Sequence, residues 1–485
     1  MSRNLYLVLA AAVFALPGSG AVAAARTAGH DAPALTHGVV VGDVTAHSAV
    51  LWARGDHEGT VSVRLSGGRH DRTERLRFRA SDDYTGQVVL SGLRPDTDYR
   101  YRVGSERGSF ETAPEDDDAE DVRIAFGGDV AGQNVCRDAR EGFPIMDTIR
   151  RFRPDVFVGL GDMIYADNAC DPVGRYGNAQ VAGPGPAAEL ATFWEHWRYN
   201  RADLASQRLL ASTGYVGVWD DHEVVNDFGP LHDTRSTPPY TPGVHLLPIG
   251  LDAFIDYTPI AIAPNTPKRL YRSLRWGKHA ELFVLDTRQY RDANSATDSP
   301  DRPKTMLGRE QLTWLKESLS ASDATWKVIV SSVPMSIPTG FPPTGGRDGW
   351  ANFDQDTGFE QELLDILRFM ESEDIRNTIW ITTDVHFAEA FRYRPFSSNP
   401  AFVVYELATG PLNAGIFPTR AFDTTLNPEV LTFFGPATAE AVTTWEEAKR
   451  WLNFGTLEFD DDGRLTAEIV NTAGQTQFSL GLTPR

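Results

Sequence analysis

The chain has 485 residues, of which 46 are Lys or Arg and 66 are Asp or Glu, so its formal net charge is −20. Its 41% hydrophobic and 23% charged residues exclude wholesale disorder, a collagen-like repeat and a polytopic membrane protein. The excess of negative charge argues against a nucleic-acid-binding surface, which needs clustered Lys and Arg to neutralise phosphates. The length predicts two or three domains, each with its own core.

Residues 1–25 have the pattern of a secretory signal peptide. A short start containing Arg3 precedes an apolar run over Leu5–Pro17, and Ala21–Ala23 offers small residues for cleavage. The apolar run is too short for a membrane-spanning helix, which needs about 20 apolar residues. A single Arg before that run does not support a twin-arginine signal. We therefore expect secretion by the Sec route, to the periplasm or the extracellular side, and no transmembrane segment.

The chain contains two cysteines, Cys136 and Cys170. In the oxidising compartment expected for an exported protein, such a pair favours a disulfide bond. The alternative is two buried or unpaired thiols. Two cysteines cannot form a four-thiolate zinc site, so we expect any catalytic metal to be held mostly by oxygen and histidine ligands.

Residues 36–114 have the pattern of a small all-β domain. Ser48–Arg54 alternates at the strand period, and so does Val61–Leu65. Further on, a turn leads into Tyr99–Val103. This last segment resembles the corner of fibronectin type III sandwiches, in which a Tyr hydroxyl bonds back to the preceding loop. We therefore expect a fibronectin type III-like sandwich here.

After an acidic linker at residues 115–121, the pattern changes to apolar strands separated by helices, which predicts an α/β domain over residues 122–485. We expect helices at Gly308–Leu319 and Phe359–Met370, and a closing β-hairpin over Thr456–Val470. In α/β sheets, the loops at the carboxyl ends of strands form the ligand crevice. Polar side chains directly follow several of the apolar strands, namely Asp129, Asp162, Asp221 with His222, and Asp384 with His386.

One aspartate at the end of a strand can simply cap the next helix. Four such strand ends favour a metal cluster, because converging carboxylates repel one another unless cations lie among them. Tyr165, on the second of these loops, adds a phenol that suits Fe(III) better than Zn(II) or Mg(II). Asp221 and Asn226 supply oxygen donors suited to Ca(II). Asp384 and His386 flank one residue, so an extended backbone would point both to one side.

The order of these motifs resembles PhoD-type alkaline phosphatases and phosphodiesterases, which belong to the calcineurin-like metallophosphoesterase superfamily. The resemblance implies a four-layer α/β/β/α metallophosphatase domain preceded by the all-β domain, and it covers nearly all of the mature chain. The motifs that carry it are Gly38–Asp43, Gly128–Asp129, Gly161–Asp167, Trp219–Val224, Leu285–Arg291, Met306–Leu315, Asp348–Trp350 and Asp384–His386.

The resemblance also implies a role for each candidate metal ligand. The implied ligands are Asp129, Tyr165 and His386 at a first site, Asp162 as the bridge, and Asp221, Asn226 and Asp384 at a second site. The implied ions are Fe(III) at the first site and Ca(II) at the second, with Zn, Mn or Mg as alternatives. PhoD-type members often carry Cys where this sequence has Asp129, so a shifted loop with Cys136 as a ligand is an alternative.

Two or more cations about 3.5–4 Å apart can hold a phosphoryl oxygen and generate a metal-bound hydroxide as the nucleophile. Asp162 and His222 are therefore the predicted catalytic residues. We expect His222 to protonate the leaving oxygen while a carboxylate such as Asp220 or Glu223 orients its ring. The alternatives for His222 are a metal ligand and a structural histidine.

Arg288 and Arg291 are predicted to contact the substrate, with a structural ion pair to Asp286 or its neighbours as the alternative. We expect a secreted, metal-dependent hydrolase of phosphate esters, an alkaline phosphatase with phosphodiesterase activity. The closest alternative is a dedicated phosphodiesterase of phospholipase D type that acts on lipid or teichoic-acid headgroups. A more distant alternative is a calcium-dependent adhesion protein with an inactive enzyme domain.

Overall fold

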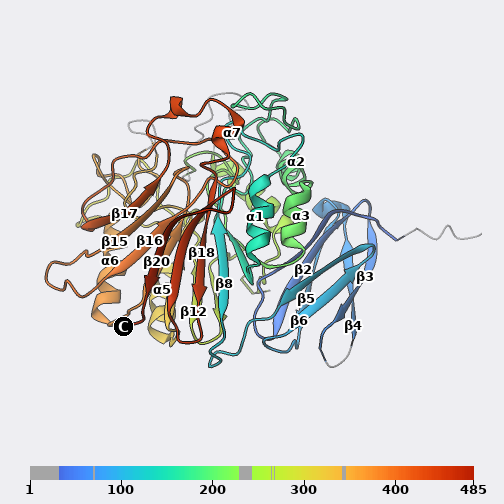
Figure 1. Ribbon diagram of the computed structural model, residues 1–485, viewed down its shortest axis with the longest axis horizontal. Coiled ribbons are helices and arrows are strands. Elements are labelled where there is room, and N and C mark those ends of the chain that lie inside the picture. Colours follow the sequence, from blue (N-terminus) through green and yellow to red (C-terminus); the bar gives the residue numbers. More distant parts are fainter. Residues whose placement is uncertain (1–31, 69–70, 229–242, 264, 267, 341–345) are drawn as a thin grey trace, which may run out of the picture. The chain divides into compact units, whose positions relative to one another are not determined.

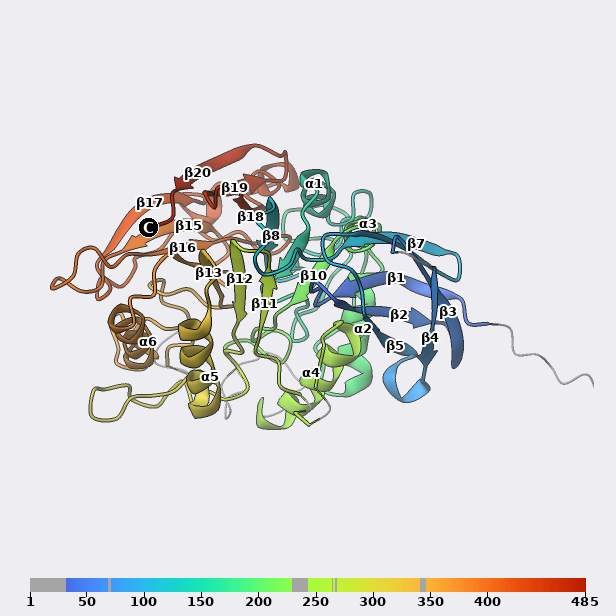
Figure 2. The same cartoon turned by 90° about the horizontal axis from the view of Figure 1, so that it is seen from below.

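The computed structural model describes residues 32–68, 71–228, 243–263, 265–266, 268–340 and 346–485. The predicted signal peptide at residues 1–25 lies outside this part of the chain. Two large β-sheets organise the described residues, and helices cover the outer face of each (Figures 1 and 2).

The first large sheet has nine strands. Its strands β8, β9, β10 and β1 run parallel to one another, and the others pair antiparallel with their neighbours. In spatial order it consists of β20 (Thr476–Leu482), β19 (Leu465–Asn471), β18 (Asn453–Phe459), β8 (Val122–Gly127), β9 (Val156–Gly159), β10 (Gly214–Gly217), β1 (Leu35–Gly42), β2 (Ser48–Gly55) and β5 (Thr85–Ser91).

The second large sheet has seven strands, and its central strands β12, β13, β14 and β16 are parallel. In spatial order it consists of β11 (Arg272–Trp276), β12 (Ala280–Val284), β13 (Trp326–Val330), β14 (Thr378–Thr382), β16 (Val404–Ala408), β15 (Ala388–Tyr393) and β17 (Pro428–Phe434). Every residue of β9, β10 and β14 is buried, as expected for strands that are covered on both faces.

Three hydrophobic cores separate the layers. The core between the two sheets contains Ile124 and Val158 from the first sheet and Val328 and Ile381 from the second. The helices α1 (Pro144–Phe152), α2 (Leu190–Arg201), α3 (Leu204–Leu210) and α4 (Gly243–Tyr257) contribute to the core on the outer face of the first sheet. The helices α5 (Gly308–Ala321) and α6 (Glu360–Ser372) contribute to the core on the outer face of the second sheet, on the side away from β18–β20 (Figure 2). The order of layers is therefore α/β/β/α, which confirms the predicted fold.

The expected elements are present with small shifts of their ends. The two predicted helices are α5 and α6, whose buried residues include Leu315 and Leu319 in one and Ile366 and Met370 in the other. The predicted closing hairpin is β18 with β19, in which Phe459 pairs with Leu465. A further short helix, α7 (Trp445–Ala448), has Thr444 as its N-cap.

The all-β region before residue 114 is a sandwich of three and four strands. The four-stranded sheet consists of β4 (Arg72–Phe78), β3 (Gly59–Ser66), β6 (Asp98–Val103) and β7 (Glu106–Glu111). The predicted tyrosine corner is present, because the Tyr99 hydroxyl accepts a hydrogen bond from the backbone N–H of Arg94 at 3.0 Å.

The other half of this sandwich consists of β1, β2 and β5, which do not form a separate sheet. Instead, β1 pairs in parallel with β10, so these strands extend the first large sheet. Asp83 adds a further contact, because its carboxylate accepts hydrogen bonds from Arg198 in α2 and from the Tyr257 hydroxyl in α4. The all-β region and the strands of the α/β region therefore share one continuous sheet.

Candidate metal centre

The candidate ligands lie in loops that follow the carboxyl ends of β8, β9, β10 and β14. Asp129 follows β8 and Asp162 follows β9, while Asp221 follows β10 and Asp384 follows β14. Backbone hydrogen bonds join the first two loops, because the Val130 N–H donates to the Asp162 carbonyl at 2.8 Å. The fold thus brings together residues that are up to 255 positions apart in the sequence.

The backbone turns sharply at these positions. Asp129, Asp162, Asp384 and His386 all have left-handed conformations, with φ values of 64°, 51°, 78° and 61°. Such φ values are uncommon outside glycine, and they concentrate where the surrounding structure holds a functional loop in place. The expectation that Asp384 and His386 lie on an extended backbone is therefore wrong. The two side chains belong to different groups of donor atoms.

The first group of donor atoms consists of Asp129, Tyr165 and His386. The Tyr165 hydroxyl lies 3.2 Å from Asp129 Oδ1 and 3.0 Å from His386 Nε2, and His386 Nε2 lies 3.5 Å from Asp129 Oδ1. The Asp129 side chain is fully buried, and Thr383 Oγ1 donates to its other oxygen at 2.7 Å. These three residues are the ones expected to bind the first metal.

The ring of His386 is oriented for metal binding. Its Nδ1 lies 2.6 Å from the Gly415 carbonyl oxygen, so Nδ1 carries the proton and Nε2 presents a lone pair toward Tyr165 and Asp129. Burial lowers the pKa of His386, which favours the neutral ring that metals bind. Burial, followed by the charges of Asp162 and Asp129, raises the pKa of Tyr165 well above its usual value. A phenolate here therefore needs a strongly polarising cation.

Close packing around Asp129 requires a glycine on the neighbouring loop. A Cβ atom at Gly410 would lie 2.4 Å from Asp129 Oδ2 and 2.8 Å from Thr383 Oγ1, and Gly410 has a φ of +129°. A side chain at Gly410 would therefore displace both the carboxylate and the hydroxyl that orients it.

The second group consists of the carboxylates of Asp162, Asp220, Asp221 and Asp384. One oxygen from each lies within 4.8 Å of the others. Within the described part of the chain, one buried oxygen of each carboxylate lacks a hydrogen-bond partner, namely Asp162 Oδ2, Asp220 Oδ2, Asp221 Oδ1 and Asp384 Oδ2.

Arg288 compensates part of this charge, since it pairs with Asp220 and lies 3.6 Å from Asp221 Oδ1. The remaining buried carboxylate oxygens are unfavourable as anions unless a cation lies among them. Burial, followed by the charges of Asp221 and Asp220, raises the pKa of Asp162 well above its usual value. Burial and the same two neighbours also raise the pKa of Asp384. Four converging carboxylate oxygens form an all-oxygen donor set, which fits a hard cation such as Ca(II).

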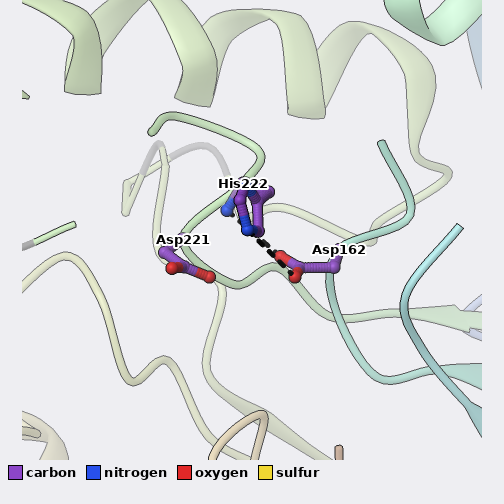
Figure 3. A group of neighbouring side chains, drawn as sticks. All are labelled: Asp162, Asp221 and His222. Carbon is purple, nitrogen blue, oxygen red and sulfur yellow. Dashed lines mark hydrogen bonds and ion pairs between the residues drawn. The ribbon is translucent and has the colours of Figure 1, made fainter. Parts of the chain in front are cut away.

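His222 lies beside this group (Figure 3). Its Nε2 is 4.0 Å from Asp162 Oδ2, and it forms a potential metal-binding group with Asp162 and Asp221. Its Nδ1 lies 2.6 Å from Asp167 Oδ1, and its ring centroid lies 3.9 Å from that of Tyr165. Burial alone would lower the pKa of His222, but the charges of Asp167 and Asp221 outweigh it and raise that pKa to about 9.

The carboxylate that orients His222 is therefore Asp167, and the expectation of Asp220 or Glu223 is wrong. Glu223 instead accepts the backbone N–H groups of Asp162, Met163 and Asp220, at 3.0, 2.7 and 2.8 Å. It thereby joins the loops that carry Asp162 and Asp220, two of the three loops of the second group. Asp167 lies within the motif Gly161–Asp167, but its spacing gave no indication that it would face His222.

Arg288 and Arg291 do not reach the surface of the site. Their side chains are 0% exposed, and both donate to Asp348 Oδ1 at 2.7 Å. Arg288 also donates to Asp220. Burial alone would raise the pKa of Asp348, but the two arginines lower it to about 2. This placement contradicts the prediction that Arg288 and Arg291 bind the substrate.

The arginines do form buried structural ion pairs, as the alternative expected, but their partners are Asp220 and Asp348 and not Asp286. Asp286 Oδ1 accepts the Trp219 ring N–H at 2.9 Å and the backbone N–H of Arg288 at 3.1 Å. Arg288 thus connects Asp220 of the second group to Asp348, and Arg291 binds Asp348 alone.

Three further residues around the second group were not assigned as ligands from the sequence. Asp220 belongs to that group, and Asp227 and Asp348 form another potential metal-binding group with Asp221. Asn226, a predicted ligand, lies next to them in the chain, and its backbone N–H donates to Asp167 Oδ2 at 3.0 Å. Asp220 and Asp227 could have been suspected from the sequence, because each is next to a predicted ligand.

A disulfide bond joins Cys136 and Cys170, with a Cα–Cα distance of 5.9 Å. This confirms the predicted pairing and removes Cys136 as an alternative metal ligand. The bond connects the loops that follow β8 and β9, which carry Asp129 and Tyr165.

Comparison with known proteins places this chain in a family. Residues 125–470 match the PhoD-like phosphatase family, and residues 21–114 match the N-terminal domain of PhoD-like phosphatases. The chain is 25% identical over 391 residues to alkaline phosphatase D of Bacillus subtilis (strain 168). That match covers 72% of this chain and 64% of the relative, so the chain spans less than two thirds of the relative's length.

Two solved structures are similar in fold. A structure of PhoD matches with a TM-score of 0.72 and 20% identity, covering 94% of this chain and 93% of the other. A purple acid phosphatase from yellow lupin (Lupinus luteus) seeds matches with a TM-score of 0.61 and 13% identity, covering 93% and 74%. Among the described residues, no helix has both the length and the apolar character needed to cross a membrane. The family match over most of the chain shows that this protein belongs to the PhoD-like phosphatases.

Proposed function

We propose that this protein hydrolyses phosphate mono- and diesters with bound metal ions, as an alkaline phosphatase with phosphodiesterase activity. The observation that carries the proposal is the pair of adjacent donor groups on joined loops, with buried carboxylate oxygens that lack hydrogen-bond partners in the described chain. Cations held there would polarise the phosphoryl group and activate a water molecule.

The residues fit two kinds of metal ion. Asp129, Tyr165 and His386 combine a carboxylate, a phenol and an imidazole, a set that suits Fe(III). At the second site, Asp221, Asn226 and Asp384 would hold Ca(II), and Asp162 would bridge the two ions. Zn, Mn and Mg are the alternative ions.

His222 is the proposed proton donor to the leaving oxygen. Asp167 binds Nδ1, so Nε2 points toward Asp162 and the second group. The charge of Asp167 also favours the protonated ring, the form that a general acid requires. Tyr165 packs against the imidazole and limits its rotation.

We also propose that residues 1–25 direct secretion through the Sec route. Secretion would place the Cys136–Cys170 bond in an oxidising environment, where disulfide bonds persist. For the rest of the chain, we propose that residues 36–114 form the all-β module, residues 115–121 the linker and residues 122–485 the catalytic domain.

The identity of the first metal has its own spectroscopic test. If Tyr165 binds Fe(III), the purified protein should have a visible charge-transfer band, and Tyr165→Phe should bleach or shift it. An active, colourless protein that contains only zinc would contradict the iron assignment while leaving the hydrolase in place.

An ester panel tests the reaction. We expect the metal-loaded protein to hydrolyse both p-nitrophenyl phosphate and its bis-ester. Asp162→Ala should lose metal and all activity, whereas Asp171→Ala, an exposed carboxylate on the same loop, should lose neither. Hydrolysis of diesters alone would favour the phospholipase D type of phosphodiesterase. A metal-loaded protein without esterase activity would contradict the proposal and favour an adhesion role.

A further inference from the structure

The metal centre is strongly acidic, and its substrate would be an anion. The two arginines nearest the second group are fully buried and bound to Asp348. Met163 follows Asp162 and provides no charge. Bound metal ions would supply most of the positive charge, so an arginine that contacts the phosphoryl group would have to reach the site from another segment of the chain.

The segment that follows β16 passes directly over the loops of the first group. The Asn413 N–H donates to the Asp129 carbonyl at 2.9 Å, and the Phe417 N–H donates to the His386 carbonyl at 3.2 Å. Together with the Gly415 carbonyl that binds the His386 ring, these bonds fix the segment against the metal centre.

This segment brings an arginine to the centre. The ring of Phe417 stacks on His386, with the centroids 4.4 Å apart and an interplanar angle of 25°. The guanidinium carbon of Arg420 lies 5.5 Å from the Phe417 centroid. Arg420 is half-buried, whereas Arg288 and Arg291 are fully buried. Its position over the aromatic ring restricts the guanidinium by a cation–π contact.

The charge of Arg420 acts on both sides of the centre. Burial lowers the pKa of Arg420, while the carboxylates of Asp384 and Asp227 act in the opposite direction. Arg420 also contributes to lowering the pKa of His386, after burial. An arginine remains protonated in this setting. Its cation therefore lies near Asp384 of the second group and His386 of the first.

We propose that Arg420 binds the phosphoryl group of the substrate, with its N–H groups directed at the non-bridging oxygens. A guanidinium suits this task because its planar donors match two phosphoryl oxygens at once. A monoester carries two negative charges and a diester one, so Arg420 favours monoesters. This inference rests on the proposed phosphoesterase function and names the side chain that recognises its substrate.

The test measures phosphate binding separately from catalysis. The dissociation constant of inorganic phosphate is measured by calorimetry on metal-loaded wild type, Arg420→Ala and Arg420→Gln, with the metal content of each sample determined. We expect both variants to keep their metals and to bind phosphate about 10- to 100-fold more weakly, the range for a lost hydrogen bond to a charged group. Arg75→Ala, an exposed arginine of β4, is the control and should bind as wild type does.

A second readout separates substrate preference from binding. In the variants, kcat/KM should fall more for p-nitrophenyl phosphate than for its bis-ester. Unchanged phosphate affinity in metal-loaded variants would overturn the inference, and so would loss of metal in both variants, which would give Arg420 a structural role. Phosphate binding that depends on Arg420 in a protein without esterase activity would support the inference while contradicting the proposed function.

Discussion

Removal of the Cys136–Cys170 bond should destabilise the protein by an amount that follows from the length of the loop it closes. The two cysteines are 34 positions apart. In the loop-entropy model, closing 34 residues removes about 12.6 cal/mol/K from the unfolded chain, which is about 3.8 kcal/mol at 25 °C. The cysteines are 0% and 8% exposed, so their replacement by alanine also removes buried sulfur contacts, which adds to this loss.

The assay is urea unfolding of wild type and of the double variant Cys136→Ala/Cys170→Ala, both with the same chelator. We expect the free energy of unfolding to fall by about 3–4 kcal/mol and the m-value to rise, because the unfolded chain becomes more expanded. Each single variant breaks the same bond and should lose nearly as much as the double variant. A loss below about 1 kcal/mol, or two titratable thiols in oxidised and denatured wild type, would refute this reasoning.

Three other substitutions test separate parts of the structure. His222→Ala should keep its metals and slow esters with poor leaving groups by about 10²–10⁴-fold, with much less effect on aryl esters; equal slowing of all esters, or metal loss, would exclude a general acid. Asp348→Asn leaves the buried Arg291 without its ion-pair partner and removes one of those of Arg288, so it should cost about 3–5 kcal/mol in urea unfolding. Asp354→Asn, at an exposed carboxylate, should cost less than about 1 kcal/mol. Burial, followed by the charge of Glu406, raises the pKa of Glu389 well above 4.5. The folded state therefore keeps a proton that the unfolded state releases above about pH 4.5, and wild type loses stability as the pH rises from there. The free energy of unfolding of Glu389→Gln, taken relative to that of wild type, should therefore be higher at pH 8 than at pH 4. An equal difference at both pH values would contradict the raised pKa.

The fold could be predicted from local patterns because its elements have strong local signals. The strands before Asp129 and Asp162 are mostly apolar, and a glycine and an aspartate follow each. The tyrosine corner at Tyr99 is likewise a short-range feature, since its hydroxyl binds a backbone group five residues away. Signals of this kind depend on neighbouring residues only.

The partners within the site could not be predicted, because they are set by tertiary structure. Arg288 and Asp348 are 60 residues apart, and nothing near either residue in the sequence indicates that they pair in the interior. The same holds for His222 and Asp167, which are 55 residues apart. A surface role for Arg288 was a reasonable expectation, since arginines are seldom fully buried unless they are paired.

Backbone conformation and sheet joining were missed for similar reasons. Asp384 and His386 flank one residue, but left-handed φ values at both turn the loop and send the two side chains to different groups. The pairing of β1 with β10 joins residues about 170 positions apart, and the sequence of neither strand indicates which strand it pairs with.

The central claim is that the two donor groups hold the metal ions that make this protein a phosphoesterase. Its most direct test is to measure hydrolysis of p-nitrophenyl phosphate while metals are removed by a chelator and then returned one at a time, with metal content determined at each step. We predict that hydrolysis disappears with the metals and returns with Fe(III) and Ca(II) together. Hydrolysis at the full rate in protein whose metal content has fallen to background would contradict the account.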